Sequence, residues 1–362
     1  MDMNLSERPQ AGRNLAVDTM RLIAIFCVIC LHTEPFNPDH LGYGWRGWQI
    51  LYVYITTACR FAVPFFFSIS GYYWGRKIRG GQNPAAVSLA MFQRIGMVFA
   101  VWSAFFLGID GLKPVVARLF PWFPGAQSFA ASSLAQPPLQ LLFEGTAHHL
   151  WFLPALLCAL AVCWFFVAFR QDRLLLPAGI ALFVLAVLGR AYAQTAIGFS
   201  PRFFGAPFDP RDGPFFSTLF FATGYLLSAH PPRPQWRRWG MFLLAAGFIL
   251  HRTEIVLIHA LFHAPPVRVI HQDFVFGTYA MGLGATMLAL AAPSWLSRPT
   301  LARWGRCTLG IYCIHPLFVH QQILCRLHST VAEVLYPAAV LLLSLLAVWP
   351  LSRLRWTRPL VL

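Results

Sequence analysis

Stretches of about 20 mainly apolar residues recur along the whole chain, and they limit what it can fold into. A helix of that length crosses the hydrocarbon core of a bilayer, where only a helix or a closed barrel satisfies every backbone polar group. Charged residues make up 11% of the 362 residues, whereas a soluble domain has roughly 25%. We therefore predict an all-α, polytopic membrane helix bundle that forms a single domain over residues 1–362. The expected transmembrane spans are residues 15–36, 49–73, 90–110, 149–169, 174–194, 214–230, 239–260, 274–293, 306–326 and 331–352.

The basic residues alternate between rich and poor connections. The rich connections lie before the first span, after every second span and after the last one, and they include residues 76–94, 233–238 and 353–358. Because cytoplasmic loops of membrane proteins carry an excess of Lys and Arg, this pattern predicts ten spans with both termini in the cytoplasm. It also accounts for the net charge of +15, so nucleic acid is not an expected partner. The eight cysteines lie in or beside apolar spans without zinc-type spacing, and we interpret them as small hydrophobic residues.

The first span carries Asp18, Arg21 and His32. Arg21 and His32 are eleven positions apart, so on a helix they share one face and are separated by roughly 16 Å along its axis. Ionisable residues inside a membrane are costly and usually functional. These residues therefore indicate a polar track through part of the bilayer. The other interpretation is that Arg21 reaches the cytoplasmic surface and His32 lies near the outer interface.

The second span has an arginine near its middle and a basic cluster at its end. Arg60 should face the bundle interior and have a partner there, because an unpaired charge in the membrane is unfavourable. Arg76, Lys77 and Arg79 should emerge on the cytoplasmic side. They are either an ordinary positive-inside anchor or a patch that binds the phosphates of a donor such as coenzyme A.

Histidines mark two further spans. Glu144 and His148 are spaced to pair on a helix, and His149 and Trp151 follow at once. Two histidines and one glutamate make a weak metal site, so we expect no metal and favour a hydrogen-bonded cluster that orients a base or binds an acceptor hydroxyl.

In the ninth span, His315 precedes a proline that frees a backbone carbonyl. His315 is either functional, together with Tyr312, or a core histidine satisfied by that carbonyl. Further weak candidates for the same cavity are Arg252, Glu254, His259, His271 and Asp273. The loop 195–213 combines aromatic residues with carboxylates, which suits either sugar binding or a membrane-interface belt.

Taken together, these stretches resemble the acyltransferase family 3 of integral membrane O-acyltransferases, over almost the whole chain. The matching motifs are the Arg21–His32 pair, the stretch from Arg60 to Gly71, the Arg76–Arg79 pair, His149–Leu153 and Leu309–Pro316. The second motif is one residue wider here, because three residues separate Arg60 from Pro64.

The resemblance implies transfer of an acyl group, usually acetyl from acetyl-CoA, to a hydroxyl of a surface or secreted glycan. The chain resembles most the stand-alone members of the family, which act on exopolysaccharide or lipopolysaccharide in the bacterial inner membrane. Other polysaccharide-assembly proteins would be its partners there. The catalytic residues are then His32, as the general base or a transient acyl carrier, with Arg21 and Asp18. Asp18 is more than two turns from His32, so we expect it to pair with Arg21 and not to orient the imidazole directly. The remaining assignments are donor binding by Arg76, Lys77, Arg79 and Arg60, and acceptor binding or oxyanion stabilisation by His149, Glu144, Trp151, Tyr312 and His315, with Arg60 a further oxyanion candidate.

The sequence leaves two other functions open. One is a transporter or flippase for a lipid-linked sugar, which ten spans with polar residues at mid-membrane would suit, although the chain shows no twofold repeat. The other is an O-acyltransferase that uses a different acyl group or a small-molecule acceptor.

Overall fold

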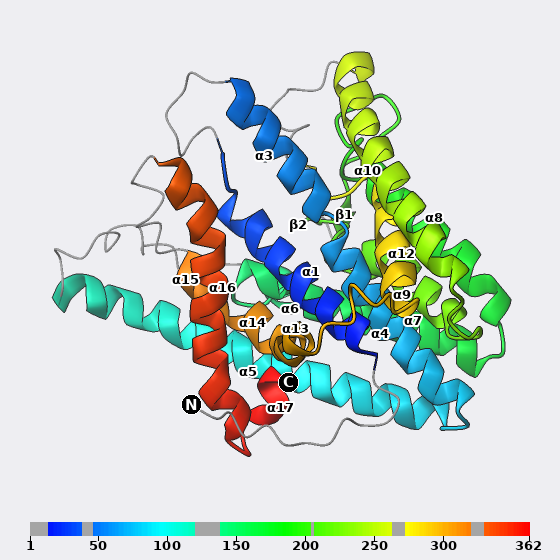
Figure 1. The fold of residues 1–362 in the computed structure, drawn as a ribbon, viewed down its shortest axis with the longest axis horizontal. Coiled ribbons are helices and arrows are strands. Elements are labelled where there is room, and N and C mark those ends of the chain that lie inside the picture. Colours follow the sequence, from blue (N-terminus) through cyan, green and yellow to red (C-terminus); the bar gives the residue numbers. More distant parts are fainter. Residues whose placement is uncertain (1–13, 38–45, 120–137, 204–205, 263–271, 320–328) are drawn as a thin grey trace.

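The helices form one bundle in the computed structural model, which describes residues 14–37, 46–119, 138–203, 206–262, 272–319 and 329–362 (Figure 1). The helices are α1 (Leu15–Thr33), α3 (Arg46–Cys59), α4 (Ala62–Arg79), α5 (Pro84–Leu119), α6 (Pro138–Glu144), α7 (Phe152–Ala168), α8 (Leu175–Leu188), α9 (Pro214–Leu227), α10 (Gln235–Phe262), α12 (Phe276–Leu290), α13 (Pro299–Trp304), α14 (Thr308–Ile314), α15 (Pro316–Val319), α16 (Thr330–Arg353) and α17 (Arg358–Val361). Short 3₁₀ turns cover His148–Trp151, Asp172–Leu174 and Gly305–Cys307, and two-residue strands, β1 (Arg202–Phe203) and β2 (Ala206–Pro207), pair antiparallel.

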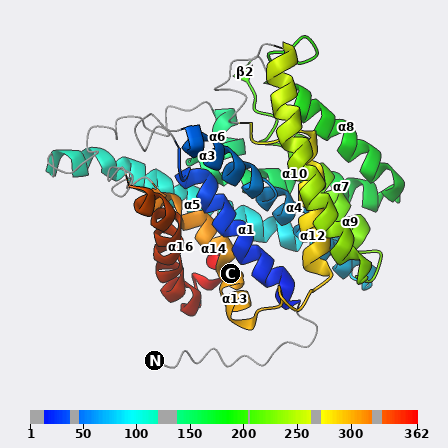
Figure 2. The ribbon, with the colours of Figure 1, turned by 45° about the horizontal axis from the view of Figure 1, so that its top comes forward.

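Helix α1 lies between two groups of helices. On one side it contacts α16 and the short helices α13 and α14, and on the other it contacts α3, α4 and α12. Figures 1 and 2 show α1 in the middle of the bundle from both directions. Helices α8, α9, α10 and α12 then complete the bundle beyond α4. The polar residues of α1 therefore lie at the junction of the two groups.

Local sequence sets both ends of α1. The Asn14 side chain accepts hydrogen bonds from the backbone N–H groups of Ala16 (3.0 Å) and Val17 (3.2 Å), which is an ordinary N-cap. At the other end Glu34 adopts a left-handed conformation with φ of 47°, and its N–H bonds to the Cys30 carbonyl at 2.9 Å. His32 thus lies in the last turn of the helix.

Glycines allow the helices around α1 to approach closely. A Cβ atom at Gly224 of α9 would lie 1.8 Å from the Ser68 carbonyl oxygen of α4, and one at Gly71 of α4 would lie 2.0 Å from that of Phe221. At Gly305, in the 3₁₀ turn between α13 and α14, a Cβ would lie 1.9 Å from the Asp18 carbonyl oxygen. Any side chain at these positions would force the helices apart, and close helix approach through small residues is typical of membrane bundles.

The structure confirms a multi-pass membrane protein. Within the described residues, six helices are long and apolar enough to cross a membrane: Leu15–Thr33, Gln49–Arg79, Pro84–Leu112, His148–Ala168, Gln235–Leu261 and Thr330–Arg353. Pro214–Leu227 and Phe276–Leu290 are shorter apolar helices. The ninth expected span corresponds to α14 and α15, and its remainder lies outside the described residues. The count of ten spans and the location of the termini stay predictions.

Two boundaries differ from the expectation. The connection expected from residue 111 begins later, because α5 continues as a helix to Leu119 through an apolar run. The second span is not one straight helix. It is divided into α3 and α4 at Arg60 and Phe61, which places the arginine at the break.

Candidate active site

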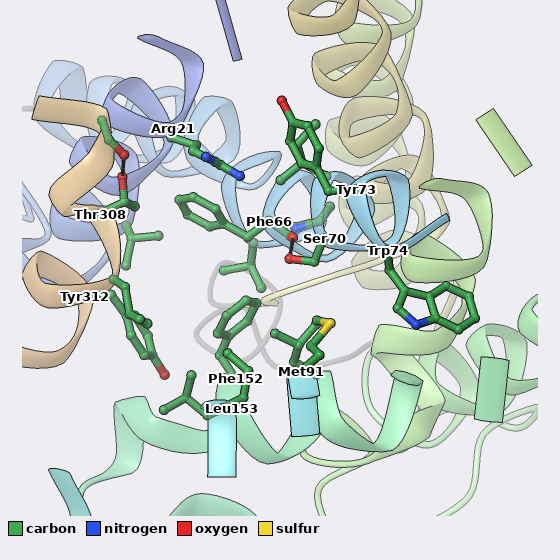
Figure 3. Close-up of a pocket in the computed structure, with 18 of the residues that line it drawn as sticks. Arg21, Phe66, Ser70, Tyr73, Trp74, Met91, Phe152, Leu153, Thr308 and Tyr312 are labelled. Atoms are coloured by element: carbon green, nitrogen blue, oxygen red, sulfur yellow. Dashed lines mark hydrogen bonds between the residues drawn. The ribbon is translucent and has the colours of Figure 1, made fainter. Parts of the chain in front are cut away.

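A cavity of about 1950 Å³ extends through the bundle and is lined by both polar residues of the α1 face, Arg21 and His32. Figure 3 shows part of its lining, with Arg21 from α1, Tyr73 from α4 and Tyr312 from α14 around one space. The eleven-residue spacing predicted this shared face. The polar track is therefore a real internal space and not only a stripe on a helix surface.

Around the N-terminal half of α1 the cavity is basic. The basic side chains that line it there come from α1, α4, α5, the α13 region and α17: Arg21, Lys77, Arg94, Arg303, Arg306 and Arg358. The Arg21 guanidinium donates to the buried Asp18 carboxylate at 3.1 Å and lies 5.5 Å from the Tyr73 ring centre. The predicted Asp18–Arg21 pair is thus present.

The predicted donor cluster on α4 divides in two. Lys77 lines the cavity, whereas Arg76 is exposed and Arg79 is directed to α9. The Arg79 Nε donates to Ser228 Oγ at 3.1 Å, and its guanidinium lies 4.6 Å from the Tyr225 ring centre. Basic residues of α5, α13 and α17 line the cavity instead of these two arginines.

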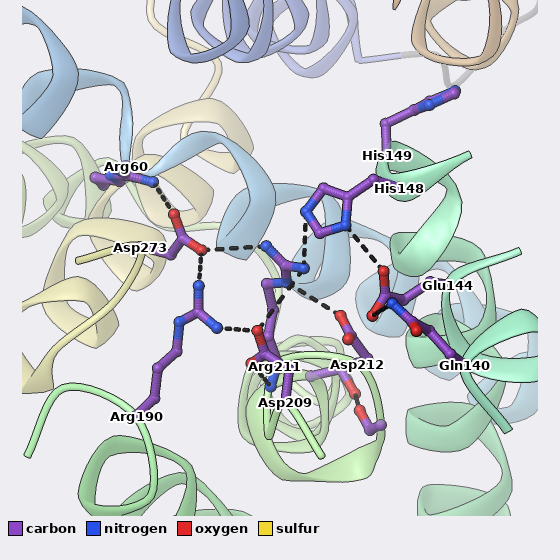
Figure 4. Close-up of polar contacts among 12 residues, drawn as sticks. Arg60, Gln140, Glu144, His148, His149, Arg190, Asp209, Arg211, Asp212 and Asp273 are labelled. Atoms are coloured by element: carbon purple, nitrogen blue, oxygen red, sulfur yellow. Dashed lines mark hydrogen bonds and ion pairs between the residues drawn. The ribbon is translucent and has the colours of Figure 1, made fainter. Parts of the chain in front are cut away.

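Arg60 has the interior partner that its position predicted. Its Nη1 donates to Asp273 Oδ1 at 2.8 Å, although the two residues are 213 positions apart. The same carboxylate accepts from Arg211 at 3.1 Å and from Arg190, which also bonds to Asp209 (Figure 4). We call Asp273 with these three arginines the Asp273 network. Arg60, Arg190, Arg211 and Asp273 all line the cavity.

A second polar group adjoins this network. Glu144 Oε2 is 2.9 Å from His148 Nδ1, so the predicted pair exists, although the two residues are not on one helix: α6 ends at Glu144 and His148 begins a separate 3₁₀ turn. A carboxylate fixes the hydrogen on Nδ1, and the Nε2 of His148 then accepts from Arg211 at 3.2 Å. Arg211 also donates to Asp212 at 3.1 Å (Figure 4). Its guanidinium carbon lies 4.6 Å from the Trp151 ring centre. Arg211 therefore joins the two groups.

The acidic side chains of this region differ in charge preference. Burial alone would raise the pKa of Asp273, but Arg190, Arg60 and Arg211 outweigh it and hold the pKa well below its usual range. Burial, with the nearby Asp209 and Glu144 charges acting in the same direction, raises the pKa of Asp212 to about 7, although Arg211 acts against it. For Glu144 the effect of burial is outweighed by His148 and Gln140, which lower its pKa. Of these three carboxyl groups, Asp273 therefore favours its charged form most strongly.

Three imidazoles meet between α1, the 3₁₀ turn before α7 and α14. The His315 ring centre is 5.2 Å from that of His32 and 5.7 Å from that of His149. His32 and His149 line the cavity, as do Trp151 and Tyr312, whereas His315 is wholly buried behind them. The Tyr312 hydroxyl donates to the His149 carbonyl. Most of the predicted acceptor residues thus surround the C-terminal half of α1.

The sequence allows two interpretations of His315, and the structure shows how its ring is bonded. Pro316 has no N–H, so the carbonyl of Tyr312 lacks its helical donor. His315 Nδ1 replaces that donor, 2.8 Å from the Tyr312 carbonyl and 3.1 Å from that of Ile311. The carbonyl freed by the proline is therefore satisfied by the preceding histidine.

Some weaker candidates lie elsewhere. Arg252, Glu254 and His259 do not line this cavity. Glu254 caps α12 instead, with its carboxylate accepting from the backbone N–H groups of Phe276 and Gly277. His271 lies outside the described residues.

The sequence did not predict that Arg190 and Arg211 bind Asp273. The only signal for Arg190 was a charge at the end of an apolar run, and for Arg211 a charge within an aromatic loop. Over the described ranges, no group of three or more metal-binding side chains is placed to hold a metal ion.

Comparison with known proteins gives one family and two distant relatives. The model of the family described as acyltransferase domain matches residues 14–353. An amino-acid racemase of Enterococcus faecalis is 22% identical over 233 residues, which are 60% of this chain and 28% of that protein. A serine/alanine racemase of Enterococcus gallinarum is 25% identical over 317 residues, 84% of this chain and 40% of that protein. The chain thus spans less than half the length of these relatives. No solved structure matches the chain.

Proposed function

This chain belongs to the acyltransferase domain family, and on that premise we propose that it transfers an acyl group, in the simplest case acetyl, from acyl-CoA to a hydroxyl of a surface or secreted polysaccharide or of its lipid-linked repeat unit. The observation that carries the proposal is the single cavity that joins a basic region to His32 and to the polar groups around Arg211. A two-substrate transfer across a membrane needs such a space, because donor and acceptor must meet at one reacting atom.

The donor enters at the basic region. Guanidinium groups bind phosphate oxygens through paired N–H donors, and acyl-CoA carries its phosphates at the end opposite the thioester. Six basic residues from five segments line the cavity around the first half of α1. From Arg21 the helix axis extends roughly 16 Å to His32, and the pantetheine arm follows this path. Lys77, Arg94 and Arg303 are therefore assigned to donor binding ahead of Arg76 and Arg79.

The transfer takes place at His32. In one version the imidazole takes the proton of the acceptor hydroxyl, whose oxygen attacks the thioester carbonyl carbon. The C–S bond then breaks, and the coenzyme A thiolate takes up the proton. In the other version a His32 nitrogen attacks the thioester carbonyl carbon and the C–S bond breaks, which releases coenzyme A thiolate. The acceptor oxygen then attacks the acyl-imidazole, the C–N bond breaks, and the hydroxyl proton goes to the thiolate. Arg60 lines the same cavity and supplies N–H donors for the oxyanion in both.

The acceptor side is formed by residues that suit a sugar. His149, Trp151 and Tyr312 line the cavity near His32, and the Glu144–His148 pair lies beside Arg211. Aromatic rings and fixed hydrogen-bonding groups together bind neutral polyols. A cytoplasmic donor and an external glycan would require the protein to act in a bacterial inner membrane, and we propose other proteins of polysaccharide assembly as its partners there. The racemase names of the two relatives describe proteins of which this chain covers less than half, and they carry no argument here.

Mass spectrometry of the host's surface polysaccharide tests the proposal. A strain without the gene should lose one O-acyl modification, which the wild-type gene restores. His32→Ala and Arg21→Ala should fail to restore it, whereas His230→Ala, an exposed histidine outside the cavity, should succeed. Equal amounts of each variant in the membrane are required for the comparison. Full acylation with both His32→Ala and Arg21→Ala would refute the proposal.

Thermal unfolding of the purified protein distinguishes the enzyme from a transporter or flippase for a lipid-linked sugar. A ligand that binds only the folded state raises the melting temperature. Acyl-CoA should stabilise the enzyme, whereas a sugar transporter has no site for it.

A further inference from the structure

The strongest unexplained feature near the reacting atoms is the Nε2 of His315. The His315 side chain is wholly buried, and among the described residues no donor or acceptor lies within hydrogen-bonding distance of this atom. Buried polar atoms without partners are rare in folded proteins, and each one calls for a functional or structural reason. The orientation of the His315 ring is fixed, because its Nδ1 bonds to backbone carbonyls of α14.

The hydrogen of the His315 ring can be assigned from its neighbours. A carbonyl oxygen only accepts, so the contacts of Nδ1 with the carbonyls of Tyr312 (2.8 Å) and Ile311 (3.1 Å) place a hydrogen on Nδ1. A second hydrogen on Nε2 would create a buried cation without a counter-ion at this atom, which is strongly unfavourable. Nε2 therefore carries a lone pair and is a hydrogen-bond acceptor of fixed direction.

His32 is a donor that this lone pair can accept from. The two ring centres are 5.2 Å apart and the ring planes are tilted by 51°. His32 is exposed to the cavity, and within the described part of the chain neither of its ring nitrogens forms a hydrogen bond. Its ring can thus turn, whereas that of His315 cannot. Among the described residues no carboxylate is hydrogen-bonded to His32: Asp18 bonds to Arg21 more than two turns away, and Glu34 accepts from Asn37 and Tyr52.

We propose that His315 is the positioning residue of His32: its Nε2 accepts the N–H of the His32 imidazole and so holds that ring with the lone pair of its other nitrogen facing the cavity. A base or nucleophilic histidine generally needs a group that sets its tautomer and direction, a task for which many enzymes use a carboxylate. Here a neutral imidazole performs it in an apolar surrounding, without the burial of a charge. The inference rests on the proposed acyl transfer.

Two amides provide a matched pair of variants. In His315→Asn the side-chain amide reaches the position of Nδ1, so it keeps the bond to the Tyr312 carbonyl and loses the acceptor at Nε2. In His315→Gln the longer side chain brings an amide oxygen to the position of Nε2. Both variants remove the aromatic ring, so a loss of packing affects them alike.

The experiment measures kcat and KM for acyl-CoA with the purified full-length protein in lipid nanodiscs. We expect His315→Asn to lower kcat about 10-fold or more, with KM unchanged, and His315→Gln to recover most of that loss. Equal activity of the two variants, a change confined to KM, or wild-type activity of His315→Asn would overturn the inference. Those results leave the proposed function intact as long as His32→Ala is inactive. A wild-type protein without acyl transfer would overturn both.

Discussion

Replacing Asp273 by Asn should destabilise the protein more than any other single isosteric change in the polar groups around the cavity. Asn has the size of Asp and one acceptor oxygen but no charge, so Arg60, Arg190 and Arg211 would lose the anion that they share. The side chains of Arg60 and Asp273 are 15% and 28% exposed. Loss of one partner from a fully buried pair costs about 3–5 kcal/mol, and surface pairs contribute about 0–1 kcal/mol. For these partly buried groups we expect a loss of about 2–3 kcal/mol.

Asp212→Asn is the matched control, since Asp212 also bonds to Arg211. Burial raises its pKa to about 7, so the fold disfavours the Asp212 charge, and its removal should cost less than about 1 kcal/mol. Thermal unfolding in nanodiscs should show an apparent melting temperature roughly 3–4 °C lower for Asp273→Asn and little change for Asp212→Asn. Equal shifts for the two variants would refute the view that Asp273 organises the three arginines.

Three further outcomes are expected. Because the arginines hold the pKa of Asp273 below its unfolded value, the difference in melting temperature between wild type and Asp273→Asn should be complete at neutral pH and shrink only below about pH 4; a difference that fades near neutral pH would contradict this sign. Gly224→Ala should prevent close packing of α9 on α4 and reduce the folded yield in the membrane, whereas Gly96→Ala, with no atom within 4 Å of the added Cβ, should leave the yield unchanged. Arg303→Ala should raise KM for acyl-CoA about 10-fold with little change in kcat, and Arg79→Ala, which removes a side chain outside the cavity, should leave KM unchanged.

Local spacing made part of the site predictable. Asp18 and Arg21 are three residues apart on α1, so a single helical turn brings them together. Glu144 and His148 are four residues apart, but a bend through Gly145 joins the end of α6 to the 3₁₀ turn at His148, so this bend brings them together and not one helical turn. The helical repeat also placed Arg21 and His32 on one face. These features needed no knowledge of the tertiary fold.

The Asp273 network could not be predicted in the same way. Helical periodicity shows which face of a helix is polar, but it does not show which other helix that face meets. Arg60 and Asp273 are 213 positions apart, and Arg190 and Arg211 come from the two ends of the connection between α8 and α9. The charge of Arg60 required a partner, and only the folded chain shows which one it has.

The donor side was uncertain for a different reason. The positive-inside rule makes every cytoplasmic connection basic, so sequence alone cannot tell an anchor from a phosphate site. Which cluster faces the cavity depends on the packing of α13 against α1 and of α17 against α5. That packing brings Arg303 and Arg358 to the cavity, whereas the Arg79 side chain of α4 bonds to Ser228 at the end of α9.

The most direct test of the account is a transfer assay with radiolabelled acetyl-CoA, the purified protein in nanodiscs and polysaccharide or lipid-linked repeat units from the strain that lacks the gene. The account predicts that wild-type protein moves the label into the glycan as a base-labile ester and releases coenzyme A. It also predicts that His32→Ala binds acetyl-CoA but transfers no label. Transfer by His32→Ala at the wild-type rate would contradict the central claim that the reaction takes place at His32.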